Sequence, residues 1–384
     1  MAEVALASAS EKQVWVTKYF QEYIRESGFK PYMGKSSMSV INTRYELQEE
    51  GGKTINIPLI TRLSASGMRG AGILDGNEEQ LGNFNCPVSV DWVRNGVRVP
   101  KSTSYKTEVD LWAAGRDMLR NWASDTLRTD LIKFMAGPVA AGVSIPAVGI
   151  FDSLGNTITT AATAANYNTW SAANADRILY GNATANYSAT HATGLANVDS
   201  TNDKLTTATA SLAKRMAKAA DPHIRPFKLE DGREYYVMFC GARSFRDLKL
   251  DTTMINANRD ARAREGKAMG ENPLFQDGDL LYDGIIFREI PEISTLITTS
   301  SIFATAGNGS ISVEPNYLCG QQAMAIAWGQ EPTPRTDMVK DYTFRPGVAT
   351  EELRGIVKVN FATGAAAATK QHGMVTVYCS GVGD

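Results

Sequence analysis

The stretch "GMRGAGILDGNEEQLGNF", residues 67–84, lies between two segments that have the pattern of β-strands. Residues 54–60 (TINIPLI) precede it and residues 88–93 (VSVDWV) follow it. Five of its eighteen residues are glycine, so the connection is pliable as well as long. A structureless connection of about 20 residues is uncommon inside a compact domain. The sequence therefore predicts a loop that is either disordered or packed against something outside its own chain.

The composition of the 384 residues is that of a globular protein with a substantial core and two or three domains. Apolar residues make up 43%, and 39 basic residues nearly balance 41 acidic ones. A net charge of −2 does not favour nucleic acid or an anionic membrane as the main partner. No signal peptide is visible, and prolines interrupt the most apolar stretch, residues 136–151. We therefore expect a protein that is made and folded in a cytoplasm.

The cysteines are far apart and form no Cys-x-x-Cys pair, which argues against a zinc knuckle or a redox motif. They are Cys86, Cys240, Cys319 and Cys379. Buried free thiols in a reducing cytoplasm are the simplest interpretation. Cys240 also ends a predicted strand before Gly241 and a helix, the position of a nucleophile on a sharp turn. Because no histidine lies in a recognisable catalytic motif, a structural thiol is favoured over a cytosolic cysteine hydrolase.

Three other motifs are incomplete. Residues 33–36 (MGKS) have the end of a phosphate-binding loop, but Phe29 stands where that motif needs glycine. Asp277, Asp279 and Asp283 begin a calcium-loop spacing that Leu281 then breaks, so a solvated turn is favoured. The basic run at 259–267 is interrupted by acidic residues and favours a charged segment over a phosphate-binding patch. The sequence thus predicts no catalytic residues, no metal site and no cofactor.

The periodicity predicts both helices and strands without regular βαβ alternation, which indicates the α+β class. Residues 152–203 are rich in Ala, Thr and Asn and read as a linker or surface insertion, part of which Trp170 and residues 176–180 indicate to be packed. An Asp-Gly turn signals the hairpin at 280–287. The predicted helices are 8–27, 108–136, 204–220 and 244–250, and the other predicted strands are 235–239, 356–361 and 374–379.

An ordered set of short stretches gives the chain a family resemblance. They are residues 57–60 (IPLI), 76–79 (GNEE), 97–99 (VRV), 224–226 (IRP), 234–237 (EYYV), 272–275 (NPLF), 282–284 (YDG), 325–329 (AIAWG) and 341–342 (DY). In this order the chain resembles the major capsid proteins of N-four-type podoviruses and their prophage relatives. The resemblance implies the Hong Kong-97-type capsid fold and a self-assembling shell protein of a tailed bacteriophage, which is not an enzyme.

The resemblance also implies a division of the chain into five segments. Residues 1–45 would form an N-terminal arm, 46–103 the extended loop that lies over a neighbouring subunit, and 104–221 a peripheral domain with a long spine helix at 108–136. Residues 222–345 would form the axial domain, and 346–384 would return to the peripheral domain. The charged residues of the extended loop are then the candidates for contacts between subunits: Arg62, Arg69, Asp75, Glu78 and Glu79.

The implied partners are copies of the same chain in hexamers and pentamers, together with separate scaffolding, portal and decoration proteins. The shell would enclose double-stranded DNA without sequence-specific binding and without a membrane, in a virion made in the bacterial host cytoplasm. No lysine occurs from Thr54 to Pro100, so we predict no lysine-based crosslink through the loop. The alternatives are an encapsulin-like nanocompartment shell and, from another class, the cysteine hydrolase that would use Cys240.

Overall fold

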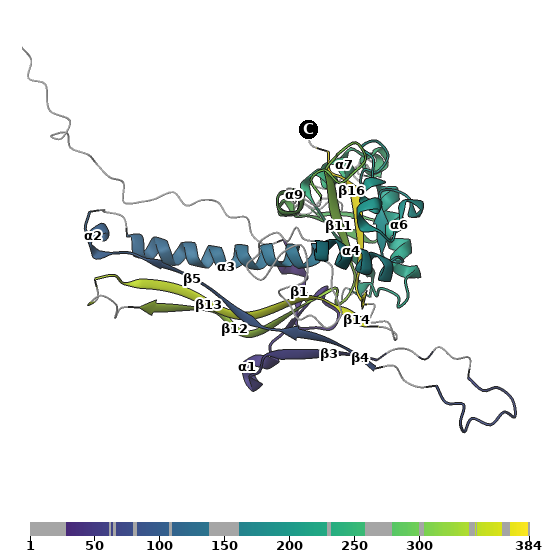
Figure 1. Cartoon of the computed structure of the whole chain (residues 1–384), viewed down its shortest axis with the longest axis horizontal. Helices are drawn as coiled ribbons and strands as arrows, with labels where there is room; N and C mark the ends of the chain where they lie inside the picture. Colours follow the sequence, from purple (N-terminus) through teal and green to yellow (C-terminus); the bar gives the residue numbers. More distant parts are fainter. Residues whose placement is uncertain are drawn as a thin grey trace, which may run out of the picture. The chain divides into compact units, whose positions relative to one another are not determined.

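The computed structural model describes residues 28–60, 63, 67–79, 83–106, 110–137, 161–228, 232–257, 279–298, 303–337, 342, 344–362 and 369–382. These residues form the mixture of helices and strands expected for an α+β protein (Figure 1). The predicted N-terminal helix and the basic run at 259–267 lie outside the described residues. No described helix is long and apolar enough to cross a membrane.

The chain divides into two compact units. Trp92–Thr126 and Glu331–Glu352 belong to one, and Gly28–Asp91, Leu127–Gln330 and Leu353–Asp384 belong to the other. These bounds differ from the five segments expected from the family resemblance. The names and limits of those segments stay predictions.

The larger unit contains a seven-stranded sheet in which β6-β16-β11-β8-β10-β9 are neighbours in that order and β7 pairs with β8. Pairing is antiparallel between β11 and β16, between β11 and β8, and between β10 and β9. It is parallel between β10 and β8 and between β16 and β6. The strands are β6 (Ile178–Tyr180), β7 (Phe227–Lys228), β8 (Glu234–Cys240), β9 (Asp279–Tyr282), β10 (Ile285–Glu289), β11 (Val313–Cys319) and β16 (Met374–Ser380).

Both faces of this sheet are buried. On β8, Val237 and Phe239 belong to a first core cluster, whereas Tyr236, Met238 and Cys240 belong to a second one on the opposite face. This division follows the alternation of side chains along a strand. The strand predicted at 235–239 is therefore confirmed as a buried strand.

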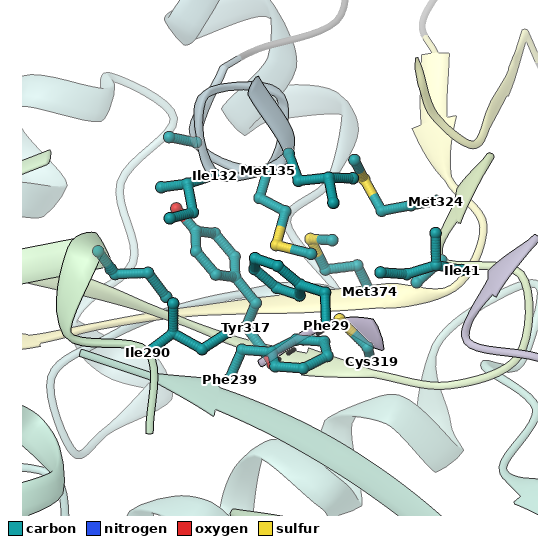
Figure 2. Close-up of a cluster of buried hydrophobic side chains, with 14 of the residues drawn as sticks. Phe29, Ile41, Ile132, Met135, Phe239, Ile290, Tyr317, Cys319, Met324 and Met374 are labelled. Atoms are coloured by element: carbon teal, nitrogen blue, oxygen red, sulfur yellow. Dashed lines mark hydrogen bonds between the residues drawn. The ribbon is translucent and has the colours of Figure 1, made fainter. Parts of the chain in front are cut away.

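Helices contribute to both clusters. The first cluster includes the end of α3 (Leu111–Ala136) and part of α4 (Ala161–Ala173), and the second includes faces of α6 (Thr207–Ala219) and α7 (Ala242–Leu250). Figure 2 shows the centre of the first cluster, where Phe29, Met135, Phe239 and Tyr317 lie close together. Phe29 meets Phe239 edge to face, with ring centroids 4.9 Å apart.

The long helix predicted at 108–136 is α3. Asp110 caps it, since its Oδ1 atom accepts hydrogen bonds from the backbone amides of Trp112 (3.0 Å) and Ala113 (3.1 Å). At the other end, the hydroxyl of Tyr167 donates to the carbonyl of Ala136 (3.1 Å). The ammonium of Lys358, which is buried, donates to the carbonyl of Gly137 (2.9 Å). Two side chains thus satisfy terminal carbonyls that a helix leaves without partners.

The segment rich in Ala, Thr and Asn is packed over its described part. Trp170 of α4 is buried, and β6 forms the edge of the seven-stranded sheet. Asp203 is also buried and accepts hydrogen bonds from the amides of Asn182 and Asp199, both at 2.8 Å. The packing that Trp170 and residues 176–180 predicted is confirmed, and residues 161–203 are part of the core-forming structure instead of a linker.

The hairpin predicted at 280–287 is confirmed as β9 and β10. Asp283 and Gly284 take positive φ angles of 49° and 68°, as a type I′ turn requires. Lys214 of α6 donates to the carbonyl oxygen and to the carboxylate of Asp283, the latter at 2.9 Å. The predicted C-terminal strands are also present, as parts of β13 (Gly347–Lys358), β14 (Asn360–Ala362) and β16.

A second sheet has the order β1-β2-β12-β13-β5, and two smaller sheets pair β14 with β15 and β3 with β4. Strand β12 contains Pro332 and Pro334, which argue against a central strand. However, β2 pairs only with Met324–Ala327, so both prolines lie beyond the end of β2.

The remaining elements are η2 (Lys30–Tyr32), β1 (Met33–Gly34), β2 (Ile41–Arg44), α1 (Glu46–Glu50), β3 (Thr54–Ile60), β4 (Asn83–Ser89), β5 (Asp91–Arg98), α2 (Lys101–Ser104), η3 (Thr184–Asn186), α5 (His191–Ala196), α9 (Pro291–Thr298), β12 (Met324–Asp337) and β15 (Thr369–Gln371).

Candidate interaction surface

The strands on either side of the glycine-rich loop form a two-stranded antiparallel hairpin. β3 and β4 pair over their whole length, from Thr54 opposite Ser89 to Ile60 opposite Asn83. The hydroxyls of Thr54 and Ser89 lie 3.0 Å apart at the base. Figure 1 shows the two strands side by side, with the described loop residues beyond their far ends. An isolated two-stranded hairpin is at best marginally stable, so this one needs further contacts.

One face of the hairpin is anchored to the body of its unit. A hairpin-base cluster of buried residues lies beneath it, and Ile55, Ile57, Leu59 and Phe84 are half-buried against that cluster. Burial decreases outward along β4, from Cys86 and Val88, which are buried, to Phe84. The hairpin-base cluster consists of Leu47, Cys86, Val88, Val90, Ala325, Ala327, Val357, Val359 and Phe361.

Beyond the hairpin-base cluster the apolar side chains are exposed to solvent. Ile60 is 64% exposed, Leu63 60%, Ile73 74% and Leu74 58%, and Met68 is also exposed. Single exposed apolar residues are ordinary, but several in one extended segment indicate a surface that binds another molecule. We call the described loop residues, 63 and 67–79, the loop tip.

The charged residues predicted as contacts lie in the loop tip, with one exception. Arg69 and Asp75 are exposed and have no ion-pair partner among the described residues. Glu78 is exposed and its Oε2 accepts a hydrogen bond from the amide of Gly76 (2.9 Å), whereas Glu79 is half-buried. Arg62 lies outside the described residues. The structure places the other four on the same loop, and their part in subunit contacts stays a prediction.

Sequence reasoning missed the apolar side chains of the loop tip. It emphasised the glycines and charges of residues 67–84 and passed over the neighbouring pair Ile73 and Leu74. The signal was present, because an apolar pair inside a polar, glycine-rich loop has no role in a solvated connection. Only the exposed fractions show that nothing in the described chain covers it.

The alternative of a cysteine hydrolase is wrong on the geometry of Cys240. Its side chain is completely buried, and burial raises the pKa of the thiol well above its ordinary value. A nucleophilic cysteine needs an accessible thiolate. Among the histidines, His191 is buried too, with Nδ1 2.9 Å from the hydroxyl of Tyr180, and burial lowers its pKa to about 3.

The structure does not bring the acidic residues considered as calcium ligands together as a calcium site among the described residues. Asp277 lies outside the described residues, and Asp283 pairs with Lys214. The hydrogen bond from Lys214 lowers the pKa of that carboxyl. Within the described ranges, no group of three or more His, Cys, Asp or Glu side chains is placed to hold a metal ion.

Comparison with known proteins assigns the chain to a family. A family model described as phage capsid protein matches residues 3–382. The chain belongs to the phage capsid protein family. The major capsid protein of Pseudomonas phage KPP25 is 26% identical to this chain over 364 residues, covering 91% of this chain and 90% of the relative.

Solved structures agree with the family assignment. The chain matches the capsid asymmetric unit of cyanophage Pam1 with a TM-score of 0.86 and 38% identity, covering 100% of both chains. The capsid of Ralstonia phage GP4 gives a TM-score of 0.70 at 21% identity, covering 100% of this chain and 99% of that one. The resemblance to phage capsid proteins and the expected capsid fold are thereby confirmed for this phage capsid protein.

Proposed function

We propose that this phage capsid protein is the major capsid protein of a tailed bacteriophage, and that many copies of it form the icosahedral shell around the double-stranded DNA genome. The observation that carries this proposal is the match of the family model to nearly the whole chain, residues 3–382. The likeness to the Pam1 capsid chain, which covers both chains completely, supports it.

The loop tip is the part of the chain that we assign to contacts between subunits. Burying a large apolar side chain contributes about 1.5–3 kcal/mol. Ile73 and Leu74, which are mostly exposed in a single chain, therefore offer a substantial gain when a neighbouring copy covers them. Arg69, Asp75, Glu78 and Glu79, with Arg62, are the candidates for ion pairs across the same contact. Exposed ion pairs contribute only about 0–1 kcal/mol each, so we assign them to orientation more than to affinity.

The remaining parts of the proposal concern assembly. Copies of the chain would occupy hexamers and pentamers, with separate scaffolding, portal and decoration proteins. The loop would not crosslink through lysine, since residues 54–100 contain none. The near balance of 39 basic and 41 acidic residues favours a genome held by confinement over one bound in a sequence-specific way. Synthesis would take place in the host cytoplasm, and the protein would have no enzymatic activity.

The experiment is assembly of the purified full-length chain. We expect uniform closed shells in electron micrographs and a matching fast boundary in analytical ultracentrifugation, under at least one condition of salt, pH or co-expressed scaffolding protein. Monomers under every condition would contradict the proposal. Shells that carry a co-purifying cargo enzyme and never a genome would favour the nanocompartment alternative instead.

A further inference from the structure

The register of the β3–β4 hairpin fixes which backbone groups point outward. The amide of Val90 donates to the carbonyl of Lys53 (2.9 Å), one step beyond the pair Thr54–Ser89. In an antiparallel ladder, hydrogen-bonded pairs alternate with pairs whose backbone groups face away from the partner strand. Counting from Lys53 and Val90, the pairs Asn56–Pro87 and Pro58–Asn85 are of the second kind. Their backbone groups face the two open edges of the hairpin.

Each open edge therefore carries a proline at a position where another residue would donate a backbone N–H hydrogen bond outward. Proline has no N–H, and its ring occupies the place where a partner strand would approach. Pro58 lies within β3 and Pro87 within β4. An added strand would lose a ladder hydrogen bond in the middle of either edge. The hairpin is thus protected against strand addition on both sides.

The face of the hairpin that points away from the hairpin-base cluster is exposed and uncharged. We call it the outer face and define it as Asn56, Pro58, Ile60, Asn83, Asn85 and Pro87, all of which are exposed. Neither β3 nor β4 contains a charged residue. No side-chain hydrogen bond of the three asparagines occurs within the described part of the chain. An exposed strand is normally protected by charges, and their depletion is typical of the centre of a protein interface.

We propose that the outer face is where the hairpin packs on a second copy of this chain, through side chains and asparagine hydrogen bonds, and that Pro58 and Pro87 prevent edge-to-edge pairing of hairpins before assembly. This inference rests on the proposed function. It adds the mode of contact: the hairpin binds by its face and not by extension of a sheet.

The chemistry of the outer face favours a second copy over the other material in a virion. Without Lys or Arg it has no positive charge to pair with phosphate groups, which disfavours DNA as its partner. Ile60 at the end of this face is 64% exposed, and the chain belongs to the phage capsid protein family. An exposed face that carries no charge suits a neighbour that is always the same molecule.

The first test places charge on the outer face. We expect the double substitution Asn56→Lys/Asn85→Lys to reduce the yield of shells at least tenfold, measured by ultracentrifugation and electron microscopy, with unchanged urea unfolding of the subunit. The matched control Asn56→Ser/Asn85→Ser keeps the face uncharged and should assemble within twofold of wild type. Full assembly of the lysine variant would overturn the outer-face assignment while the proposed function stands. Wild-type protein that never forms shells would contradict the proposed function itself.

The second test opens the edges and uses only unassembled subunits. Pro58→Thr/Pro87→Thr restores both outward amides without adding charge. We expect this variant to self-associate at least several-fold faster than wild type under non-assembling conditions, measured by light scattering, with a rise in intermolecular β-sheet signal in the infrared amide band. A variant that stays as monomeric as wild type would overturn the protective role of the prolines, whether or not shells form.

Discussion

The seven-stranded sheet and the β3–β4 hairpin differ in how far their apolar side chains are buried within one chain. In β8, Val237 and Phe239 are buried on one face and Met238 on the other, all within one chain. In the hairpin, one face is half-buried, the outer face is open, and Ile73 of the loop tip is 74% exposed. The sheet is covered on both faces by other parts of its own chain, whereas the hairpin and loop tip have apolar surface whose burial requires another molecule. The difference separates the residues that fold the subunit from those that we assign to joining subunits.

The largest effect on subunit stability is expected from the sheet. Phe239→Ala removes a completely buried ring that contacts Phe29 and Tyr32. We expect a loss of about 3–5 kcal/mol in the free energy of unfolding, because a cavity is left in the first core cluster. Guanidinium denaturation of the unassembled subunit measures this loss. A loss below about 1 kcal/mol would mean that the seven-stranded sheet does not hold the main core of the subunit.

A second expected effect is a pH dependence of the unfolding free energy that comes from buried histidines and not from the loop tip. Burial lowers the pKa of His191 to about 3 from the ordinary 6.5, so between these values the unfolded chain binds a proton that the folded chain excludes. Stability should therefore fall as pH falls from 6.5, by up to about 1.4 kcal/mol per pH unit. His191→Gln should remove this contribution to the slope. His372, whose pKa burial lowers to about 4, should contribute a similar slope between pH 6.5 and 4, and that slope should remain in the variant.

The pH experiment has a clear opposing result. The described loop tip contains no histidine, so its substitutions should leave the slope unchanged. If urea unfolding at pH 6.5, 5.5 and 4.5 gives the same slope for wild type and His191→Gln, the buried imidazole is not the cause.

A graded effect is expected along the hairpin itself. Val88→Ala, in the hairpin-base cluster, should cost about 2 kcal/mol of unfolding free energy, and the half-buried Ile57→Ala about 1 kcal/mol. Leu74→Ala in the loop tip should change it by less than about 0.5 kcal/mol. Denaturation of the three variants sharpens the comparison by locating where the body of the subunit ends. Equal costs at all three positions would show that the loop tip is folded onto its own chain.

The sequence predicted elements that depend on local chemistry. The Asp283–Gly284 turn is visible because both residues tolerate positive φ, and the strand at 235–239 because it is a continuous apolar run. Strand β11 was missed, since Glu314, Pro315 and Asn316 look unlike a buried strand. Glu314 is buried there because it accepts the amide of Ser244 in the first turn of α7 (2.6 Å), a contact 70 residues away that no local pattern reveals.

The candidate surface was predictable only in part, for the same reason. The long loop between two strands was evident from five glycines among residues 67–84. The face that each hairpin residue presents depends on the register, which the bond between Val90 and Lys53 fixes. Whether Ile73 and Leu74 have cover depends on the absence of neighbours among the described residues. Neither property is encoded in the spacing of residue types.

Assembly of the variant Ile73→Ser/Leu74→Ser tests most directly whether the loop tip joins subunits without stabilising them. Ile73→Val/Leu74→Met keeps the surface apolar and serves as its control. For the serine variant we expect an unfolding free energy within about 0.5 kcal/mol of wild type and a loss of shells in ultracentrifugation, with shells retained in the control. Normal shells from the serine variant, or a subunit destabilised by several kcal/mol, would contradict the assignment of the loop tip to contacts between copies.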